Sequence, residues 1–593
     1  MASISDKEDQ VTHEEFAKPE TRSPPKHIEQ GGFETDESTL PKGYFYSTFF
    51  LGSYAAIALG LWAGTAAFAY AAPILGQINA DIGPDERYVW VSLVYNVCST
   101  VWFPIVGRFG DIFGRRYIMI AGALCAVIGS VICATAHSIP VLIGGNVFLG
   151  SASAVQLSFS YLLAELLPMK YRYFGTGTLY LFSIPGSGLG SAIAYTFVTQ
   201  YSVGWRGIYW FLLAINGTAL VCWVAFYFPP TFEEKHKTDI ESKVYWLKHF
   251  DYFGMFLFAS GFVVFLMGLS WGGAIYPWDS AAVICAIVIG FIVLVCFVIW
   301  EVFGPVKQPL IPMRLFLNGR WTAAVVLLGL GAGVYYAFTI VWPQQVAVLY
   351  ANGDLMYTGY LSLIVGLGFI TGQVFSGLLG TSIGKMRYQC MTAFTLGGIF
   401  LGCAATVTLY NKKTQIALLY IGCAFIGWNE GISLTNSTVL VNDQRDIGVA
   451  GGTAGCVRSG ISAILTAIYT TVLTNRLTKT IAIEVPPALI EAGLPATSVA
   501  GFLEALSTGT TEAFQSIPGI SQRIIAAGSV AYKLANADAY RTVYLTTIAF
   551  SGPAIILTWF APNTEGFMTG QVAATLNHQG KELEAKKLGG EGV

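Results

Sequence analysis

The sequence predicts an all-α polytopic membrane protein with 14 transmembrane helices, arranged as two six-helix halves plus an inserted helix pair. Three observations predict this class. Of the 593 residues, 54% are hydrophobic and 11% are charged, whereas roughly a quarter of the residues of a soluble domain are charged. Apolar windows of about twenty residues, the length that crosses a bilayer as a helix, recur along the chain. A weak internal repeat relates the early windows to the late ones.

The apolar windows define the expected spans in order. They cover residues 46–74, 88–106, 117–136, 139–160, 175–198, 207–228, 252–271, 280–300, 322–343, 358–379, 388–409, 415–438, 449–474 and 542–561. The number of windows is even, so both termini face the same side of the membrane. The short loops of the other side hold only Arg87, Arg206, Lys412 and Lys413. Because Lys and Arg accumulate in cytoplasmic loops, we expect both termini in the cytosol.

The repeat divides the long chain. Gly377-x-x-x-Thr381-x-x-Gly384 follows span ten with the spacing of Gly107-x-x-x-Asp111-x-x-Gly114 after span two. This parallel repeat favours two halves with the substrate path between them. The expected segments are a disordered cytosolic tail (1–45), an N-terminal half (46–228), a cytosolic linker (229–251), the inserted pair (252–300), a second linker (301–321), a C-terminal half (322–561) with an outer loop (475–540), and a cytosolic tail (562–593).

A charged, glycine-punctuated turn joins spans two and three. Its defining residues are Gly107, Asp111, Gly114, Arg115 and Arg116. Glycine permits a sharp reversal and a close approach of two helices, and Asp111 can pair with an arginine or accept bonds from a helix N-terminus. The spacing G-x-x-x-D-x-x-G-R-R resembles the signature loop of the major facilitator superfamily of secondary transporters.

A second segment after span four is similar to the E-x-x-P-x-x-x-R loop of the same superfamily. It runs from Glu165 through Pro168 to Arg172. We expect Glu165 and Arg172 to form a cytosolic gate together with the Asp111 turn, as a charge network that breaks when the gate opens. The alternative is a set of screened surface pairs, each worth about 0–1 kcal/mol.

Three further stretches resemble fungal fourteen-span transporters of this superfamily. They are Trp271-Gly272-Gly273 with Tyr276-Pro277-Trp278, the run from Pro309 to Phe316, and Gly451-Gly452-Thr453-Ala454-Gly455. Ala539-Tyr540-Arg541 after the outer loop looks most like the group of trichothecene efflux pumps, close to fungal siderophore-iron transporters. The resemblance implies proton-coupled transport by alternating access, and it does not fix the cargo. Our hypothesis is a plasma-membrane transporter that exports a hydrophobic, trichothecene-like fungal metabolite or toxin. A vacuolar or vesicle membrane, import of an iron–siderophore chelate, and a transporter-like receptor stay open.

Glu430 is the most informative single residue, because it lies deep in span twelve. A charged carboxylate at mid-span costs roughly 2.5–3.5 kcal/mol and usually faces a cavity or a partner. Counted from the assumed inner helix ends, Glu430 and Arg458 lie at similar depths of roughly 12 and 15 Å. We therefore expect the two to pair and to carry proton coupling. A fixed salt bridge between two helices is the alternative.

Polar and aromatic residues on the span faces are candidates for cargo binding. They are Trp62, Asn96, Asn146, Gln156, Tyr335, Tyr336, Trp428 and Asn429. Amides would supply hydrogen bonds and the aromatic rings would supply apolar walls. The alternative is that amides bond neighbouring helices and that Trp and Tyr mark membrane interfaces.

Two departures from the superfamily pattern weaken proton exchange as an inference. Antiporters commonly carry an arginine in span four where this chain has Asn146, and the Gly-Pro signature of span five is altered at Ser183-Ile184-Pro185-Gly186. The direction of transport is correspondingly open.

Other classes of function find no support in the sequence. Cysteines lie singly in apolar spans and histidines do not cluster, so neither a metal site nor a disulfide framework is expected. No basic cluster interleaved with aromatic residues indicates nucleic-acid binding. No enzymatic site and no cofactor are expected, the energy source being a proton gradient. The expected partners are a small hydrophobic substrate and the lipid bilayer, with the chain as a monomer.

Overall fold

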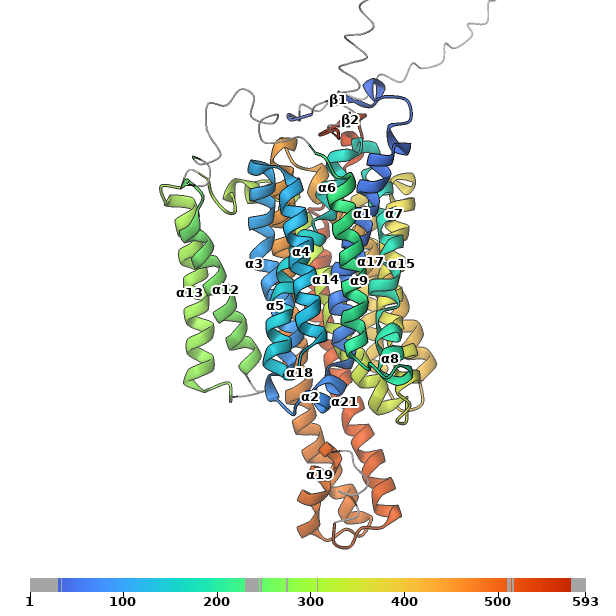
Figure 1. The fold of residues 1–593 in the computed structure, drawn as a ribbon. Helices are drawn as coiled ribbons and strands as arrows, with labels where there is room; N and C mark the ends of the chain where they lie inside the picture. Colours follow the sequence, from blue (N-terminus) through green and yellow to red (C-terminus); the bar gives the residue numbers. More distant parts are fainter. Residues whose placement is uncertain are drawn as a thin grey trace, which may run out of the picture.

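The computed structural model describes residues 30–33, 35–229, 245, 248–272, 276–306, 308–508, 514 and 517–576. Its helices run side by side in one bundle (Figure 1). Twelve helical stretches of this described part are long and apolar enough to cross a membrane. The expected tails and first linker lie largely outside the described residues, which omit 1–29, 230–244 and 577–593.

The first group of helices begins at Thr48, where the Ser47 side chain caps the backbone. The group comprises α1 (Thr48–Ala71), α2 (Leu75–Ile82), α3 (Trp90–Phe113), α4 (Arg115–Ala134), α5 (Ile139–Gln156), α6 (Phe159–Leu166), α7 (Arg172–Phe182), α8 (Gly190–Gln200) and α9 (Arg206–Phe226). A π-helical turn at Ile184–Gly188, which contains Pro185, separates α7 from α8. Proline removes a helical hydrogen bond, which explains the break.

The turn expected at residues 107–116 is shorter than its sequence indicates. Helix α3 continues through Gly107 and Gly110 to Phe113, and α4 begins at Arg115. Gly114 alone makes the reversal, with a φ of 88° that favours glycine. Gly107 is therefore helical, and its role lies in a close helix contact described below.

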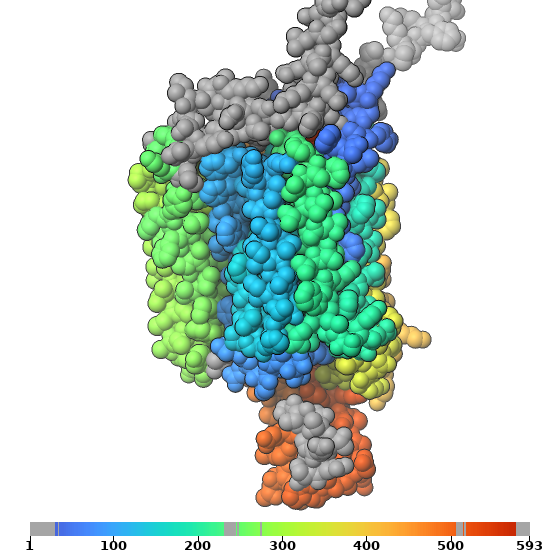
Figure 2. Space-filling view, viewed as in Figure 1, coloured from blue at the N-terminus to red at the C-terminus, as the bar shows by residue number. Residues whose placement is uncertain are grey.

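Two helices form a separate layer at one edge of the bundle. These are α12 (Tyr252–Trp271) and α13 (Ala281–Phe303), drawn in light green in Figures 1 and 2. Helix α12 packs between α13 and the pair α3 and α18. Phe262 and Leu266 of α12 are buried against Val97 of α3 and Ala463 of α18.

The second group of helices completes the bundle. It comprises α14 (Gly319–Leu349), α15 (Leu355–Ile383), α16 (Met386–Cys403), α17 (Lys412–Val439), α18 (Ile447–Glu491), α19 (Val499–Thr508) and α21 (Gln522–Thr558). The twelve membrane-capable stretches do not include the broken segment α7–α8 or α21. The break leaves α7 and α8 with 11 residues each, and α21 mixes apolar residues with Thr, Ser and Tyr.

Helices α18 and α21 extend beyond the rest of the bundle and form a protruding hairpin with α19 (Figures 1 and 2). Helix α18 has 45 residues, about 67 Å at 1.5 Å per residue, which exceeds the roughly 30 Å of a bilayer core. The hairpin has its own core around Leu489, Phe502 and Ile524. The segment expected as an outer loop, 475–540, is thus largely a continuation of two helices.

The opposite end of the bundle, which we call the terminal face, carries the only sheet of the described residues. Strand β1 (Thr35–Asp36) pairs antiparallel with β2 (Gln571–Val572), at the top of Figure 1. Part of the tail that we expected to be disordered is therefore held against the bundle. Its polar composition gave no sign of this, because the strand partner lies at the far end of the chain.

Candidate functional site

A small cavity of about 40 Å³ lies between the two groups of helices. Its aromatic lining comprises Phe103, Phe159, Tyr180, Tyr335, Tyr336 and Phe369, and its polar lining comprises Thr65, Ser160, Ser187, Gln373 and Arg458. Sites for small molecules usually measure roughly 300–1,000 Å³. The cavity is therefore too small for a bulky ligand in this conformation.

Three polar side chains converge beside this cavity. Arg458 on α18 lies with its Nη2 atom 2.7 Å from Oε1 of Glu430 on α17. Gln373 on α15 donates from Nε2 to the other carboxylate oxygen, Oε2, at 2.7 Å. Both oxygens of the Glu430 carboxyl group are therefore bound.

The three side chains differ in whether they reach the cavity. The Glu430 side chain is 0% exposed, and only Arg458 and Gln373 line the cavity. A ligand in the cavity would therefore reach the carboxylate only through these two residues. Gln373 is not among the residues expected from the sequence. Its signal is a single amide among the glycines and apolar residues of α15, the same signal that a helix-packing residue gives.

Only two of the expected cargo residues line the cavity. The ring of Tyr335 stacks on Phe369, with centroids 4.6 Å apart, and Tyr336 packs edge-on against Phe68 at 4.7 Å. The Arg458 guanidinium lies 5.6 Å from the Tyr336 ring. This aromatic wall thus continues directly into the charged pair.

The other expected cargo residues lie away from the cavity in this conformation. Asn146 donates to the Leu142 carbonyl, Gln156 to Asn216 Oδ1, Trp428 to Gln389 Oε1, Asn429 to the Leu327 carbonyl and Trp62 to the Tyr70 hydroxyl. The Asn96 amide nitrogen is buried without a hydrogen-bond partner among the described residues. Most of these groups bond within or between helices, as polar side chains in membranes often do.

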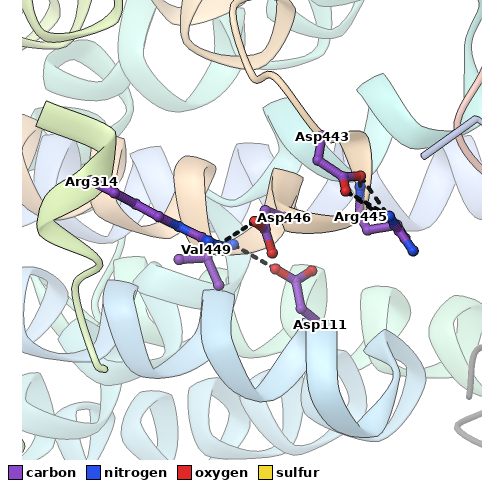
Figure 3. Close-up of polar contacts among 6 residues, drawn as sticks. All are labelled: Asp111, Arg314, Asp443, Arg445, Asp446 and Val449. Atoms are coloured by element: carbon purple, nitrogen blue, oxygen red, sulfur yellow. Dashed lines mark hydrogen bonds and ion pairs between the residues drawn. The ribbon is translucent and has the colours of Figure 1, made fainter. Parts of the chain in front are cut away.

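The expected gate residues meet at the terminal face. The Arg115 side chain, which is 1% exposed, lies 2.8 Å from Asp111 Oδ1 and 2.6 Å from Glu165 Oε2. The second Asp111 oxygen, Oδ2, accepts a hydrogen bond of 2.7 Å from the Val449 backbone nitrogen (Figure 3). Asp111 of the first group thus binds the first turn of α18 in the second group, where a helix favours negative charge.

Arg172 makes a second crossing between the groups. It donates from Nη1 to the Thr438 carbonyl at 3.0 Å and from Nη2 to Gln444 Oε1 at 2.9 Å. Arg116 binds within its own group instead, to the Val224 carbonyl at 2.9 Å and to the Tyr227 carbonyl. The structure therefore brings Asp111 and Arg172 to the crossing and places Arg116 away from it.

Glycines permit the close approach at this crossing. A Cβ added to Gly107 would lie 2.3 Å from the Gly448 carbonyl oxygen, and one added to Gly377 would lie 2.4 Å from the Gly177 Cα. The first contact joins α3 to α18, and the second joins α15 to α7. The contact between α3 and α18 therefore resembles the contact between α15 and α7.

A vestibule of about 1,200 Å³ opens at the terminal face beside the expected gate residues. Its charged lining comprises Arg108, Asp111, Glu165, Glu301, Arg314, Arg445 and Asp446. Arg314 Nη2 lies 2.7 Å from Asp446 Oδ2, and Arg445 Nη2 lies 2.8 Å from Asp443 Oδ2 (Figure 3). The hydrogen bond from Arg445 lowers the pKa of Asp443, so this carboxylate stays charged at neutral pH.

Comparison with protein families gives a match over nearly the whole chain. The family described as fungal trichothecene efflux pump (TRI12) matches residues 10–591. The MFS-type transporter prx5 of Penicillium rubens is 31% identical over 80% of this chain and 84% of its own length. The trichothecene efflux pump TRI12 of Fusarium sporotrichioides is 26% identical over 91% of this chain and 90% of its own length.

Two solved structures of transporters have a similar fold. The crystal structure of a D-xylose–proton symporter superposes with a TM-score of 0.51, at 14% identity, over 88% of this chain and 99% of that one. The human organic anion transporter MFSD10 superposes with a TM-score of 0.50, at 14% identity, over 86% of this chain and 99% of that one. At this level of identity the likeness shows the fold alone.

Proposed function

The chain belongs to the fungal trichothecene efflux pump family, and from that premise we propose that this membrane transporter exports a hydrophobic, trichothecene-like metabolite in exchange for protons. The observation that carries the proposal is the buried pair of Glu430 and Arg458, whose arginine borders a cavity with aromatic walls. A carboxylate at that depth is costly, and such residues usually have a partner and a function. Here it has a partner that a cargo molecule could contact.

The proposed cycle alternates access to the cavity. We place the terminal face in the cytosol and the chain in the plasma membrane, since Lys and Arg concentrate in the loops of that face. Cargo then enters from the vestibule when the contacts of Asp111 and Arg172 separate. Contact of cargo with Arg458 and Gln373 weakens their hold on Glu430, which takes up a proton in one state and releases it in the other.

The proposed architecture has 14 spans in two halves. The segment α7–α8 and helix α21 supply the two spans beyond the twelve apolar stretches, and α12 with α13 is the inserted pair. The matching glycine contacts of α3 with α18 and of α15 with α7 support the parallel repeat, because related helices occupy related places. The gate then lies where the two halves meet.

The function is tested by efflux from cells. Cells that express the chain and control cells are preloaded with a labelled trichothecene, and loss of label is followed with and without an imposed proton gradient. We expect faster loss in expressing cells, and only when protons can flow inward. If no toxin leaves under either condition while labelled iron–siderophore chelate accumulates, the protein is an importer and the export proposal is wrong.

Replacing Asp111 by Asn tests the gate. The amide can still accept the Val449 hydrogen bond, but it loses the charge that binds Arg115. A hydrogen bond to a charged group contributes roughly 1–2 kcal/mol more to stability than a neutral one. Losing that contribution between Asp111 and Arg115 should therefore lower efflux about fivefold to thirtyfold. The matched control is Asp85→Asn, which breaks an ion pair with Arg87 of 2.7 Å whose arginine is 62% exposed. An equal effect in both variants would contradict the gate.

A further inference from the structure

The described parts of both tails cross the terminal face, and each of them reaches the helical group to which it is not joined. The N-terminal arm, residues 30–33 and 35–37, precedes α1 of the first group. The C-terminal arm, residues 569–576, follows α21 of the second group. The arms cross where β1 pairs with β2, with Thr35 opposite Val572. Each arm thus links its own helical group to the other group.

The N-terminal arm binds the loop between α17 and α18. Gln30 Nε2 donates to the Val439 carbonyl at 3.1 Å. The Gly31 backbone nitrogen donates to the Asn442 carbonyl at 3.1 Å, and its carbonyl accepts from the Gln444 nitrogen at 2.9 Å. Gly32 lies so close to this loop that an added Cβ would be 2.3 Å from Asp443 Oδ1.

The C-terminal arm binds the end of α6 and the turn that follows it. The Thr569 carbonyl accepts from the Lys170 backbone nitrogen at 3.1 Å, and the Ala574 nitrogen donates to the Glu165 carbonyl at 3.0 Å. Val572 and Leu576 are fully buried. Glu37 of the other arm reaches the same turn, with Oε2 lying 2.5 Å from Lys170 Nζ.

The residues held by the arms are those of the gate. Glu165, bound through its backbone by the C-terminal arm, pairs through its side chain with Arg115. Gln444, bound through its backbone by the N-terminal arm, accepts through its side chain from Arg172. Gly32 and Phe33 of one arm and Ala573 and Ala574 of the other also line the vestibule. The arms therefore touch both sides of the gate and wall the space outside it.

We propose that the two terminal arms form a latch that holds the gate closed and must detach before the vestibule connects with the cavity. Separation of the groups at this face moves the loop at 439–445 away from Glu165 and Lys170. Each arm spans that gap, so at least one end of each arm has to release. The latch rests on the proposed gate at this face, but it requires neither a particular cargo nor proton coupling.

The variant Gly32→Ala detaches one arm with a single methyl group. Gly32 has a φ of 85°, and its Cβ would also lie 2.7 Å from the Arg445 backbone nitrogen. The matched control is Gly43→Ala. Gly43 has a φ of 89°, and its Cβ would meet no atom within 4 Å. Both variants carry the same left-handed backbone cost, and only Gly32→Ala strikes the loop.

The measurement is hydrogen exchange of the full-length protein in lipid nanodiscs. The reporter is the first turn of α18, where the Val449 amide binds Asp111. Losing about one net hydrogen bond from the latch should speed exchange there about threefold to tenfold in Gly32→Ala, with no change in Gly43→Ala. Faster exchange confined to residues 439–445, with the α18 turn unchanged, would overturn the latch.

A second variant keeps the test independent of position 32. Ala574→Pro removes the backbone N–H that binds Glu165, because proline has no such donor. The same turn of α18, on the other side of the gate, should again exchange faster. If Ala574→Pro speeds exchange only within the C-terminal arm, the latch proposal is wrong. Export can fail its own test while this exchange still accelerates, so the two proposals are judged separately.

Discussion

Glu430→Gln is expected to reduce gradient-driven efflux to the level of cells that lack the protein, while exchange of labelled for unlabelled cargo continues. Glutamine keeps the shape of the side chain and an oxygen that can accept from Arg458, but it cannot carry a proton. Net export coupled to protons needs that step, whereas one-for-one cargo exchange does not. Proteoliposomes with an imposed pH difference measure the first process, and counterflow without a gradient measures the second.

The matched control for this variant is Asp538→Asn. Asp538 pairs with Arg476 at 2.6 Å, a distance like that of the Glu430 pair, but in the protruding hairpin and with side chains 34% and 43% exposed. Exposed pairs contribute little, about 0–1 kcal/mol, so both transport modes should be unchanged. Gradient-driven efflux that persists in Glu430→Gln would mean that the pair is a fixed bridge between α17 and α18.

A structural bridge also predicts a different stability. Breaking a buried ion pair by removing one partner costs about 3–5 kcal/mol, because the remaining charge is left uncompensated. A coupling residue that must lose its charge during the cycle should tolerate neutralisation better. Thermal unfolding of both variants in the same detergent distinguishes these cases without any transport measurement.

The sequence located the charged pair because charge is rare inside apolar spans. Glu430 and Arg458 stand out in their windows, and their distances in residues from the helix ends predict matching depths. Gln373 did not stand out in this way. An amide in a membrane helix most often bonds a neighbouring helix, and only the fold shows that this one lies between the cavity and the carboxylate.

The terminal arms were beyond sequence reasoning for a different reason. The N-terminal arm is mostly polar, which is the composition of an unstructured tail. The C-terminal arm mixes Thr, Gly and Gln with Val, Ala and Leu over only eight residues, too few for a helical period to show. Their order comes from pairing β1 with β2, at opposite ends of the chain. Such a pairing is favourable only after the bundle has brought the ends together. Local hydropathy predicts the spans, whereas the ordered conformation of the arms depends on the folded bundle.

The predicted span boundaries also differ from the observed helix ends, because a hydropathy window has a fixed length. Helix α18 continues to Glu491 and α21 begins at Gln522, because the added turns are helical without being apolar. The hairpin buries Val485, Leu489 and Ile524 against α19 instead of against lipid. A hydropathy window detects the membrane part of such a helix and stops where packing against another helix takes over.

Gly107→Ala is expected to lower efflux about tenfold or more by holding the two groups of helices apart. The added Cβ would lie 2.3 Å from the Gly448 carbonyl oxygen and 3.1 Å from the Gly452 Cα. Both are backbone atoms, so no side chain can turn away, and α3 must shift from α18. Asp111 lies one turn further along α3 and would lose its bond to Val449. Packed helices tolerate such insertions poorly, at roughly 1–3 kcal/mol each.

The control Gly144→Ala separates this contact from helix propensity. Gly144 also lies inside a helix, α5, but its Cβ would meet no atom within 4 Å. Alanine favours a helix over glycine by about 1 kcal/mol, so Gly144→Ala should be as active as the parent and slightly more stable. Gly107→Ala gains the same propensity, and a loss of efflux must therefore come from the contact. Equal activity of the two variants would mean that α3 and α18 need not meet this closely, and the gate would then rest on the polar contacts of Asp111 and Arg172 alone.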